Sequence, residues 1–152
     1  MDFRNLNEMN QETLLQIAKD YGSPVYVYDA HKMEAQYNRL TAAFSNVNKL
    51  KINYAAKALT NISVLKFINK LGAGLDTVSI QEVRLGLHAG FVPEKIIYTP
   101  NGVSLEEIEE VAKLGVQINI DNLSILEQFG TKHPTTPVCI RINPHIMAGG
   151  NT

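Results

Sequence analysis

The chain has 152 residues, of which 45% are hydrophobic and 19% are charged, and its formal net charge at pH 7 is −1. This composition is typical of a globular domain, and the near-zero charge argues against binding to nucleic acid or to an anionic membrane surface. No apolar run reaches the roughly 18 residues that a membrane span needs, and the single cysteine, Cys139, allows no internal disulfide. We therefore expect a cytoplasmic protein.

Residues 1–46 predict a helix, a short strand and a second helix. Asn10 begins an amphipathic helical pattern that Gly22 ends. The β-branched and aromatic residues of "SPVYVYD" (23–29) predict a strand. Asp29 is expected to cap the second helix. We interpret this segment as a lead-in whose strand belongs to a neighbouring β domain of the full-length protein.

From residue 47 onward, a strand and a helix recur roughly every 20 to 24 residues, the length of one such unit with two tight loops. Ser104 and Glu107 form the sequence pattern of a capping box at the start of one helix. Strict alternation forces parallel strands that are joined by right-handed crossovers. An open doubly wound sheet and a (β/α)₈ barrel both fit. The five strand segments are "LKINYAAK", "LDTVS", "KIIYT", "VQINI" and "PVCIRIN".

Polar residues at the strand ends favour the barrel, because its active sites are built from the C-terminal ends of several strands. Helix capping explains Asn101 and Asp121, but it explains neither Lys57 nor Arg141. Alternation along "KINYAAK" and "VCIRIN" places these two cations on the inner face, at the same end. A full barrel takes about 250 residues, so we expect α/β architecture with residues 47–152 forming the first five βα units of an incomplete TIM-type barrel.

An inward lysine at position 57 allows three roles. It could pair with a buried acid such as Asp76, or bind a phosphate as a point charge. It could also be held partly desolvated, so that its neutral amine forms a Schiff base with a carbonyl group. Position alone leaves these roles open.

Two segments resemble motifs of the fold-type III pyridoxal-phosphate decarboxylases. "NYAAKALTN" resembles the Tyr-Ala-x-Lys-Ala segment that carries the cofactor lysine, and "GAGLDTVSIQEV" resembles the Gly-x-Gly-x-Asp-x-x-Ser-x-x-Glu segment. "IYTPNGVS", "INIDNLSIL" and "CIRINPHIMAGGNT" resemble the third, fourth and fifth barrel strands of the family. Within the family, the "RINP" segment is most similar to the diaminopimelate decarboxylases. One departure is Leu59, which follows Lys57-Ala58 where many members have asparagine.

The resemblance implies a carboxy-lyase that uses pyridoxal 5′-phosphate to convert meso-2,6-diaminopimelate to L-lysine and carbon dioxide in lysine biosynthesis. Lys57 would be the catalytic residue and would bind the cofactor covalently, with Asp76 and Arg141 also binding the cofactor. Weaker candidates for the site are Ser79, Glu82 and Asn143. The family's phosphate loop and other site residues would lie beyond Thr152. The chain is thus expected to be an N-terminal fragment that is inactive alone, from a protein that forms a homodimer.

Other functions fit the same motifs. The protein could be another fold-type III enzyme, such as an ornithine- or arginine-type decarboxylase or an alanine racemase-like protein. It could also be a non-catalytic protein that keeps the pyridoxal-phosphate barrel. The histidines show no spacing typical of metal ligands, so we expect no metal site. They are His31, His88, His133 and His145.

Overall fold

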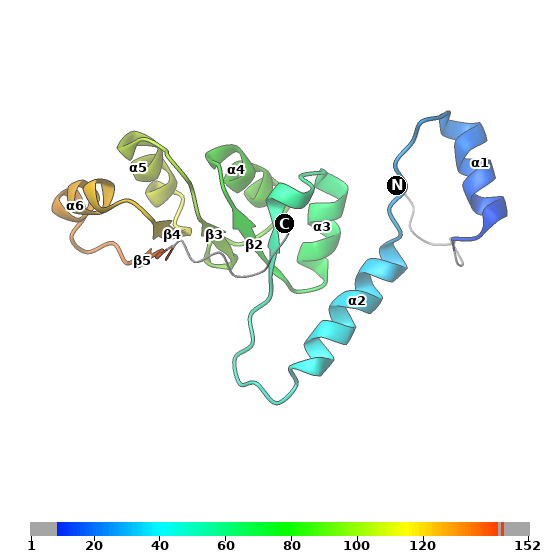
Figure 1. Cartoon of the computed structure of the whole chain (residues 1–152), viewed down its shortest axis with the longest axis horizontal. Helices are drawn as coiled ribbons and strands as arrows, with labels where there is room; N and C mark the ends of the chain where they lie inside the picture. The colour runs from blue at the N-terminus through cyan, green and yellow to red at the C-terminus, as the bar shows by residue number, and fades with distance from the viewer. Residues whose placement is uncertain (1–8, 143, 145–152) are drawn as a thin grey trace. The chain divides into compact units, whose positions relative to one another are not determined.

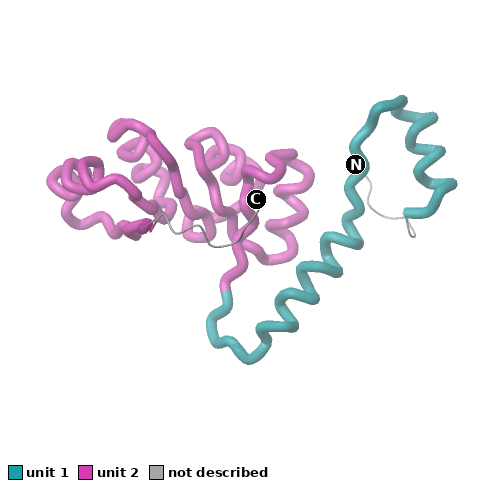
Figure 2. Tube along the Cα trace, viewed as in Figure 1, with its two compact units in different colours: residues 1–50 teal, residues 51–152 magenta. Residues whose placement is uncertain are grey.

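The computed structural model of this chain describes residues 9–142 and 144. They fall into two compact units, residues 1–50 and 51–152 (Figure 2). Within the described residues, no helix is both long and apolar enough to cross a lipid bilayer.

Unit 1 contains two capped helices, α1 (Gln11–Tyr21) and α2 (Ala30–Ala43). The side-chain oxygens of Asn10 and Asp29 accept hydrogen bonds from backbone N–H groups in the first turns, at 2.9 and 3.1 Å. Such caps satisfy N–H groups that have no partner within the helix. The cap at Asp29 and the start of α1 at Asn10 were predicted from the sequence, and Gly22 ends α1 at a φ of 82° as expected.

No strand is assigned at residues 23–29, where the sequence predicts one that would belong to a neighbouring β domain. The segment has no regular secondary structure, and Tyr26 within it is 90% exposed. An extended segment becomes a strand only when a neighbouring strand takes up its backbone hydrogen bonds. The β-branched and aromatic residues indicated that the segment prefers an extended backbone, but no described strand pairs with it.

Unit 2 is a five-stranded parallel sheet covered by helices (Figure 1). The strands run in sequence order, and each pairs with the next. The strands are β1 (Asn53–Ala55), β2 (Gly74–Thr77), β3 (Ile96–Tyr98), β4 (Gln117–Ile120) and β5 (Val138–Ile140). The helices are α3 (Ile62–Lys70), α4 (Ile80–His88), α5 (Leu105–Lys113) and α6 (Leu123–Lys132), and the 3₁₀ turns are η1 (Ala56–Ala58) and η2 (Pro93–Lys95).

The strand order decides between the two architectures that the sequence allowed. A doubly wound sheet reverses its strand order and carries helices on both faces. Right-handed crossovers that always move in one direction place every helix on the same face, and α3 to α6 lie along one side of this sheet (Figure 1). The barrel-type expectation is confirmed, and β1 and β5 are the two edges of the described sheet.

The hydrophobic core lies between the sheet and its helices. Successive strand residues point to opposite faces, so Ile96 and Tyr98 are fully buried under the helices while Ile97 between them is half-buried. We call the uncovered side of the sheet the open face. By alternation and register its residues are Asn53, Ala55, Gly74, Asp76, Ile97, Thr99, Gln117, Asn119 and Cys139.

Glu107 links three consecutive parts of unit 2. Its Oε1 accepts hydrogen bonds from the Tyr98 hydroxyl at 2.6 Å and from the Ile80 N–H at 3.3 Å. Burial of Tyr98, together with this carboxylate, raises the pKa of its hydroxyl. The predicted capping box is therefore only half formed: Ser104 Oγ accepts from the Glu107 N–H, while the Glu107 carboxylate serves β3 and α4.

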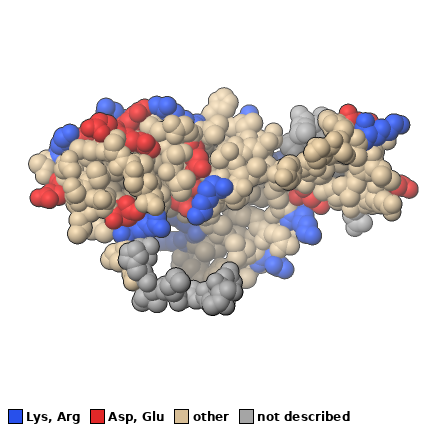
Figure 3. Space-filling model, turned by 45° about the horizontal axis from the view of Figure 1, so that its top comes forward, with Lys and Arg blue, Asp and Glu red and all other residues tan. Residues whose placement is uncertain are grey.

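Charged side chains of both signs lie on the face of the molecule that Figure 3 shows. Arg84 of α4 pairs with Glu110 of α5. Glu109 of α5 is 3.1 Å from both His133 Nε2 and Lys132 Nζ, and these contacts lower the pKa of its carboxyl group. Ion pairs at or near the surface stabilise a fold by little each, so the apolar core carries most of the stability.

Helix α6 passes through Gly130 without a break. It continues to Lys132 and ends where the His133 N–H donates to Phe129 O. A glycine is compatible with a helix interior at a modest cost in free energy. It ends a helix only where the backbone turns to a positive φ, as it does at Gly90 with a φ of 94°.

Gly86 permits the close approach of α4 to the sheet. A Cβ atom at this position would lie 2.5 Å from Leu75 Cδ2 and 3.3 Å from Ile96 Cδ1. Both neighbours are 0% exposed. They have little room to move, because protein interiors are close-packed.

We predict that Gly86→Val lowers the free energy of unfolding by about 1–3 kcal/mol through overpacking. Thermal unfolding measures the effect, and Gly130→Val is the matched control. Nothing lies within 4 Å of a Cβ at Gly130, and valine favours helix more than glycine does. The control should therefore keep or raise the melting temperature; equal melting temperatures for the two variants would contradict this account.

Candidate functional site

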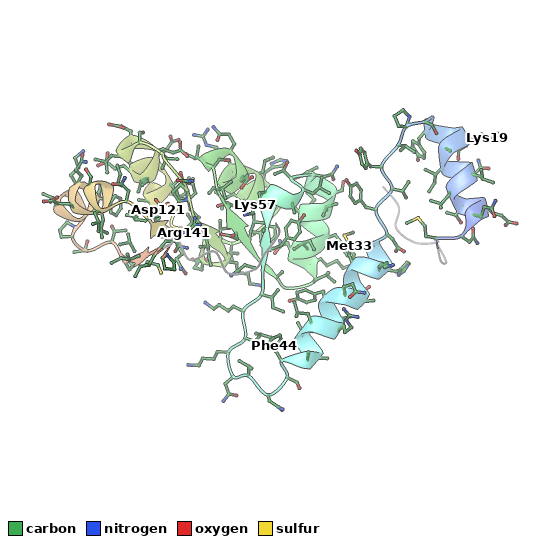
Figure 4. The ribbon with its side chains drawn as sticks, viewed as in Figure 1. Lys19, Met33, Phe44, Lys57, Asp121 and Arg141 are labelled. Atoms are coloured by element: carbon green, nitrogen blue, oxygen red, sulfur yellow. The ribbon has the colours of Figure 1, made fainter. Side chains whose placement is uncertain are left out.

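Three chemically active side chains follow strand ends at one edge of the sheet. Lys57 comes just after β1, Asp121 just after β4 and Arg141 just after β5 (Figure 4). Parallel strands all end at the same edge, so Lys57 and Arg141 lie along one rim, as their sequence positions indicated. The Arg141 N–H donates to Ile120 O at 2.9 Å, which extends the β4–β5 pairing up to this residue.

Lys57 lies on a turn and not on a strand. Strand β1 ends at Ala55, and Lys57 sits within η1. The turn is anchored by Ala56, which is fully buried, and by Tyr54, whose hydroxyl donates to Leu59 O at 3.2 Å. The strand alternation used in the sequence analysis therefore does not extend to this residue.

The side chain of Lys57 is exposed, and this corrects the expectation of a water-poor position. Helices α3 to α6 of unit 2 lie on the other face of the sheet, and the described sheet has no strands opposite η1. In the described part of the chain, no ion pair joins Lys57 to Asp76 or to another carboxylate. The role of a paired structural lysine is therefore not observed, and the amine is available to a ligand.

A row of polar side chains crosses the open face next to this rim. The Thr99 hydroxyl donates to Asp76 Oδ1 at 3.1 Å and accepts from Asn119 Nδ2 at 2.9 Å. These three residues, which we call the polar row, come from β2, from the position directly after β3 and from β4. Asp76, the member that the sequence singled out, is half-buried. It pairs with Ala55, which precedes Lys57 by two residues.

Thr99 and Asn119 were missed in the sequence analysis. Asn119 stands between Ile118 and Ile120, which are 1% and 2% exposed, so alternation alone could have placed it on the open face. Contact with Asp76 was not predictable, because it depends on the register between neighbouring strands.

Ser79 and Glu82, the weaker candidates, start helix α4. Ser79 Oγ accepts from the Glu82 N–H at 3.3 Å, and Glu82 Oε2 accepts from the Val78 N–H at 2.8 Å. This arrangement satisfies backbone N–H groups at the helix start, and it accounts for both side chains without a ligand. Asn143, the third weaker candidate, lies outside the described residues.

Asn101 and Asp121 are not helix caps, contrary to expectation. The N-caps are Ser104 for α5 and Asn122 for α6, whose Oδ1 accepts from the Ile125 N–H at 3.1 Å. Both Asn101 and Asp121 are exposed at the rim. A shallow cavity of about 30 Å³ lies between the two loops that carry them. Its lining residues are Pro100, Gly102, Val103, Ile108, Ile120, Asp121, Asn122 and Ile125.

The donor set fits an anionic cofactor that carries an aldehyde. An amine reacts as a nucleophile only if no carboxylate holds it in an ion pair, and Lys57 has no such pair among the described residues. The guanidinium of Arg141 suits phosphate or carboxylate oxygens. Asp76 adds an acceptor for N–H donors. Among the described residues, no group of three or more His, Cys, Asp or Glu side chains could hold a metal ion.

The comparisons with known proteins agree with this donor set. Residues 30–152 match the family model described as "Pyridoxal-dependent decarboxylase, pyridoxal binding domain". The diaminopimelate decarboxylase of Methanothermobacter thermautotrophicus is 36% identical over 137 residues, which cover 89% of this chain and 32% of that protein.

Solved structures show the same similarity. The diaminopimelate decarboxylase of Helicobacter pylori, complexed with L-lysine, has a TM-score of 0.76 and 34% identity, covering 90% of this chain and 35% of that chain. The enzyme from M. jannaschii in co-complex with L-lysine has a TM-score of 0.77 and 27% identity, covering 88% and 33%. This chain therefore spans about a third of the length of the relatives it matches.

We predict that Ser79→Ala lowers the free energy of unfolding by about 1 kcal/mol through loss of the cap, without weakening the binding of pyridoxal phosphate. Thermal unfolding and a titration of cofactor absorbance measure the two effects. Ser79→Thr keeps the capping oxygen and should preserve stability. A marked loss of cofactor affinity in Ser79→Ala would show that the hydroxyl belongs to the site.

Proposed function

As the chain belongs to the pyridoxal-dependent decarboxylases, we propose that the full-length protein removes one carboxyl group of meso-2,6-diaminopimelate and forms L-lysine. It would act as a carboxy-lyase of lysine biosynthesis. The observation that carries this proposal is the position of Lys57, an exposed amine without an ion pair among the described residues, at the C-terminal rim of a parallel sheet. The substrate is inferred from relatives that are diaminopimelate decarboxylases.

Lys57 would bind pyridoxal 5′-phosphate through its Nζ atom and give it up to the amino group of the substrate. When bound, this cofactor supplies an electron sink for the negative charge that remains as carbon dioxide leaves. Arg141 would attract an anionic group of the cofactor or substrate by its positive charge. The Asp76 carboxylate would accept a hydrogen bond from a protonated nitrogen in the site.

Exclusion of water is the part of catalysis that the described residues do not provide. Lys57 and Arg141 are both exposed, and none of the described helices of unit 2, α3 to α6, covers the open face. Electrostatic stabilisation is strongest in a site from which water is excluded. We infer that segments outside this chain cover the open face in the full-length protein, and that a second copy of the protein contributes to this cover in a homodimer.

We predict that Lys57→Ala in the full-length protein abolishes the carbon dioxide release from meso-2,6-diaminopimelate and the adduct that borohydride traps with pyridoxal phosphate, because no amine remains for covalent attachment. Carbon dioxide assay and mass spectrometry measure the two effects. Lys51→Ala is the matched control, since Lys51 is another exposed lysine just before β1. A trapped adduct that survives in Lys57→Ala would refute the assignment.

We also expect the 152-residue chain alone to release no carbon dioxide from the same substrate with added pyridoxal phosphate, because its open face is accessible to water. The unaltered full-length protein, assayed in parallel, is the positive control. Turnover by the isolated chain at a rate comparable to the full-length protein would contradict the inferred need for cover.

A further inference from the structure

The hydrogen bonds of the polar row all run in one direction. An ionised carboxylate only accepts, so the Thr99 hydroxyl uses its single proton on Asp76 Oδ1. The second contact of that hydroxyl must then be with a donor, which is Asn119 Nδ2. Asn119 Oδ1 in turn accepts from Gln117 Nε2 at 3.5 Å. Each member donates to the next, from β4 across β3 to β2.

The backbone holds both neutral members of the row in place. The Thr99 N–H donates to Thr77 O at 2.7 Å, and threonine is restricted at χ1 by its branched Cβ. Asn119 lies inside β4, between two buried isoleucines. The two residues therefore lack the freedom of loop side chains, and they fix the direction from which Asp76 is approached.

One oxygen of Asp76 is left for a ligand. Oδ1 accepts from Thr99, whereas Oδ2 has no hydrogen-bond partner within the described part of the chain. The register places Asp76 level with Ala55, two residues before Lys57. A donor on a molecule attached at Lys57 would find Oδ2 already oriented, and preorganisation of this kind reduces the cost of binding.

We propose that Thr99 and Asn119 are positioning residues, which orient the Asp76 carboxylate so that Oδ2 accepts a hydrogen bond from a protonated nitrogen of the cofactor or substrate at Lys57. This inference rests on the proposed function, because it needs a molecule bound at that lysine. Neither residue touches the ligand; both act through Asp76.

The test compares full-length proteins that carry Thr99→Val or Thr99→Ser. Valine removes the hydroxyl and keeps the branched shape, and serine restores the hydroxyl. Two readouts are taken with pyridoxal phosphate alone: the dissociation constant, and the pH midpoint of the cofactor absorbance band. We expect Thr99→Val to weaken binding roughly tenfold, the effect of one hydrogen bond to a charged group, and to shift the pH midpoint. Thr99→Ser should retain most of both.

A second variant tests the direction of the row. Asn119→Asp replaces the N–H donor by an acceptor, which competes with Asp76 for the single hydroxyl proton of Thr99. We expect it to change both readouts in the same direction as Thr99→Val. Its effect should be smaller in the Thr99→Val background than alone, because contacting residues of one network are not additive.

Thr77→Val is the matched control. Thr77 is 0% exposed and its hydroxyl donates to Ile97 O at 2.9 Å, so this substitution makes the same chemical change on the helix-covered face. It should lower the melting temperature and leave the pH midpoint unchanged. If Thr99→Val binds the cofactor like the unaltered protein, with the same midpoint, or if Thr77→Val moves the midpoint equally, the inference is overturned.

The failure of the inference can be told apart from the failure of the proposed function. Normal cofactor binding by the unaltered protein without carbon dioxide release from diaminopimelate refutes the proposed substrate, while the spectra still decide the role of Thr99. Carbon dioxide release together with an unchanged Thr99→Val spectrum refutes only the role of Thr99. An unaltered full-length protein that binds no pyridoxal phosphate overturns both.

Discussion

The one-sided covering of the sheet is the constraint on which the rest of unit 2 depends. Strands in sequence order with right-handed crossovers place all helices on one face. Burial of one half of each strand under these helices supplies the main stabilising free energy, as at Ile96 and Tyr98. The strand residues on the open face do not pack against these helices, so polar side chains such as Asp76 and Asn119 can occupy that face.

The chemistry of the chain is distributed in the same way. The amine of Lys57, the carboxylate of Asp76 and the guanidinium of Arg141 come from different βα units, and they lie toward the same rim because parallel strands all end there. Residues at the starts of the helices have another task. Ser79 and Glu82 lie within a few residues of Asp76, yet their side chains satisfy the backbone of α4. Short distance in the sequence is thus no guide to which residues share the site.

The sequence predicted the features that local rules decide, and it missed those that depend on distant partners. The cap at Asp29 and the helix start at Asn10 follow from residue type and spacing, and the helix-facing residues follow from alternation. The expected strand at residues 23–29 has no described partner, and a 3₁₀ turn at Lys57 interrupts the alternation. The hydrogen bond from the Tyr98 hydroxyl to the Glu107 carboxylate could not be predicted, because it depends on how α5 packs against β3.

The polar row lies in strands or directly after them, and not in the loops beyond the rim. Thr99 continues the pairing of β3, and Asn119 lies within β4, so neither depends on the conformation of the loops beyond the rim. Insertions or substitutions in those loops would therefore leave the hydrogen bonds between Asn119, Thr99 and Asp76 in place.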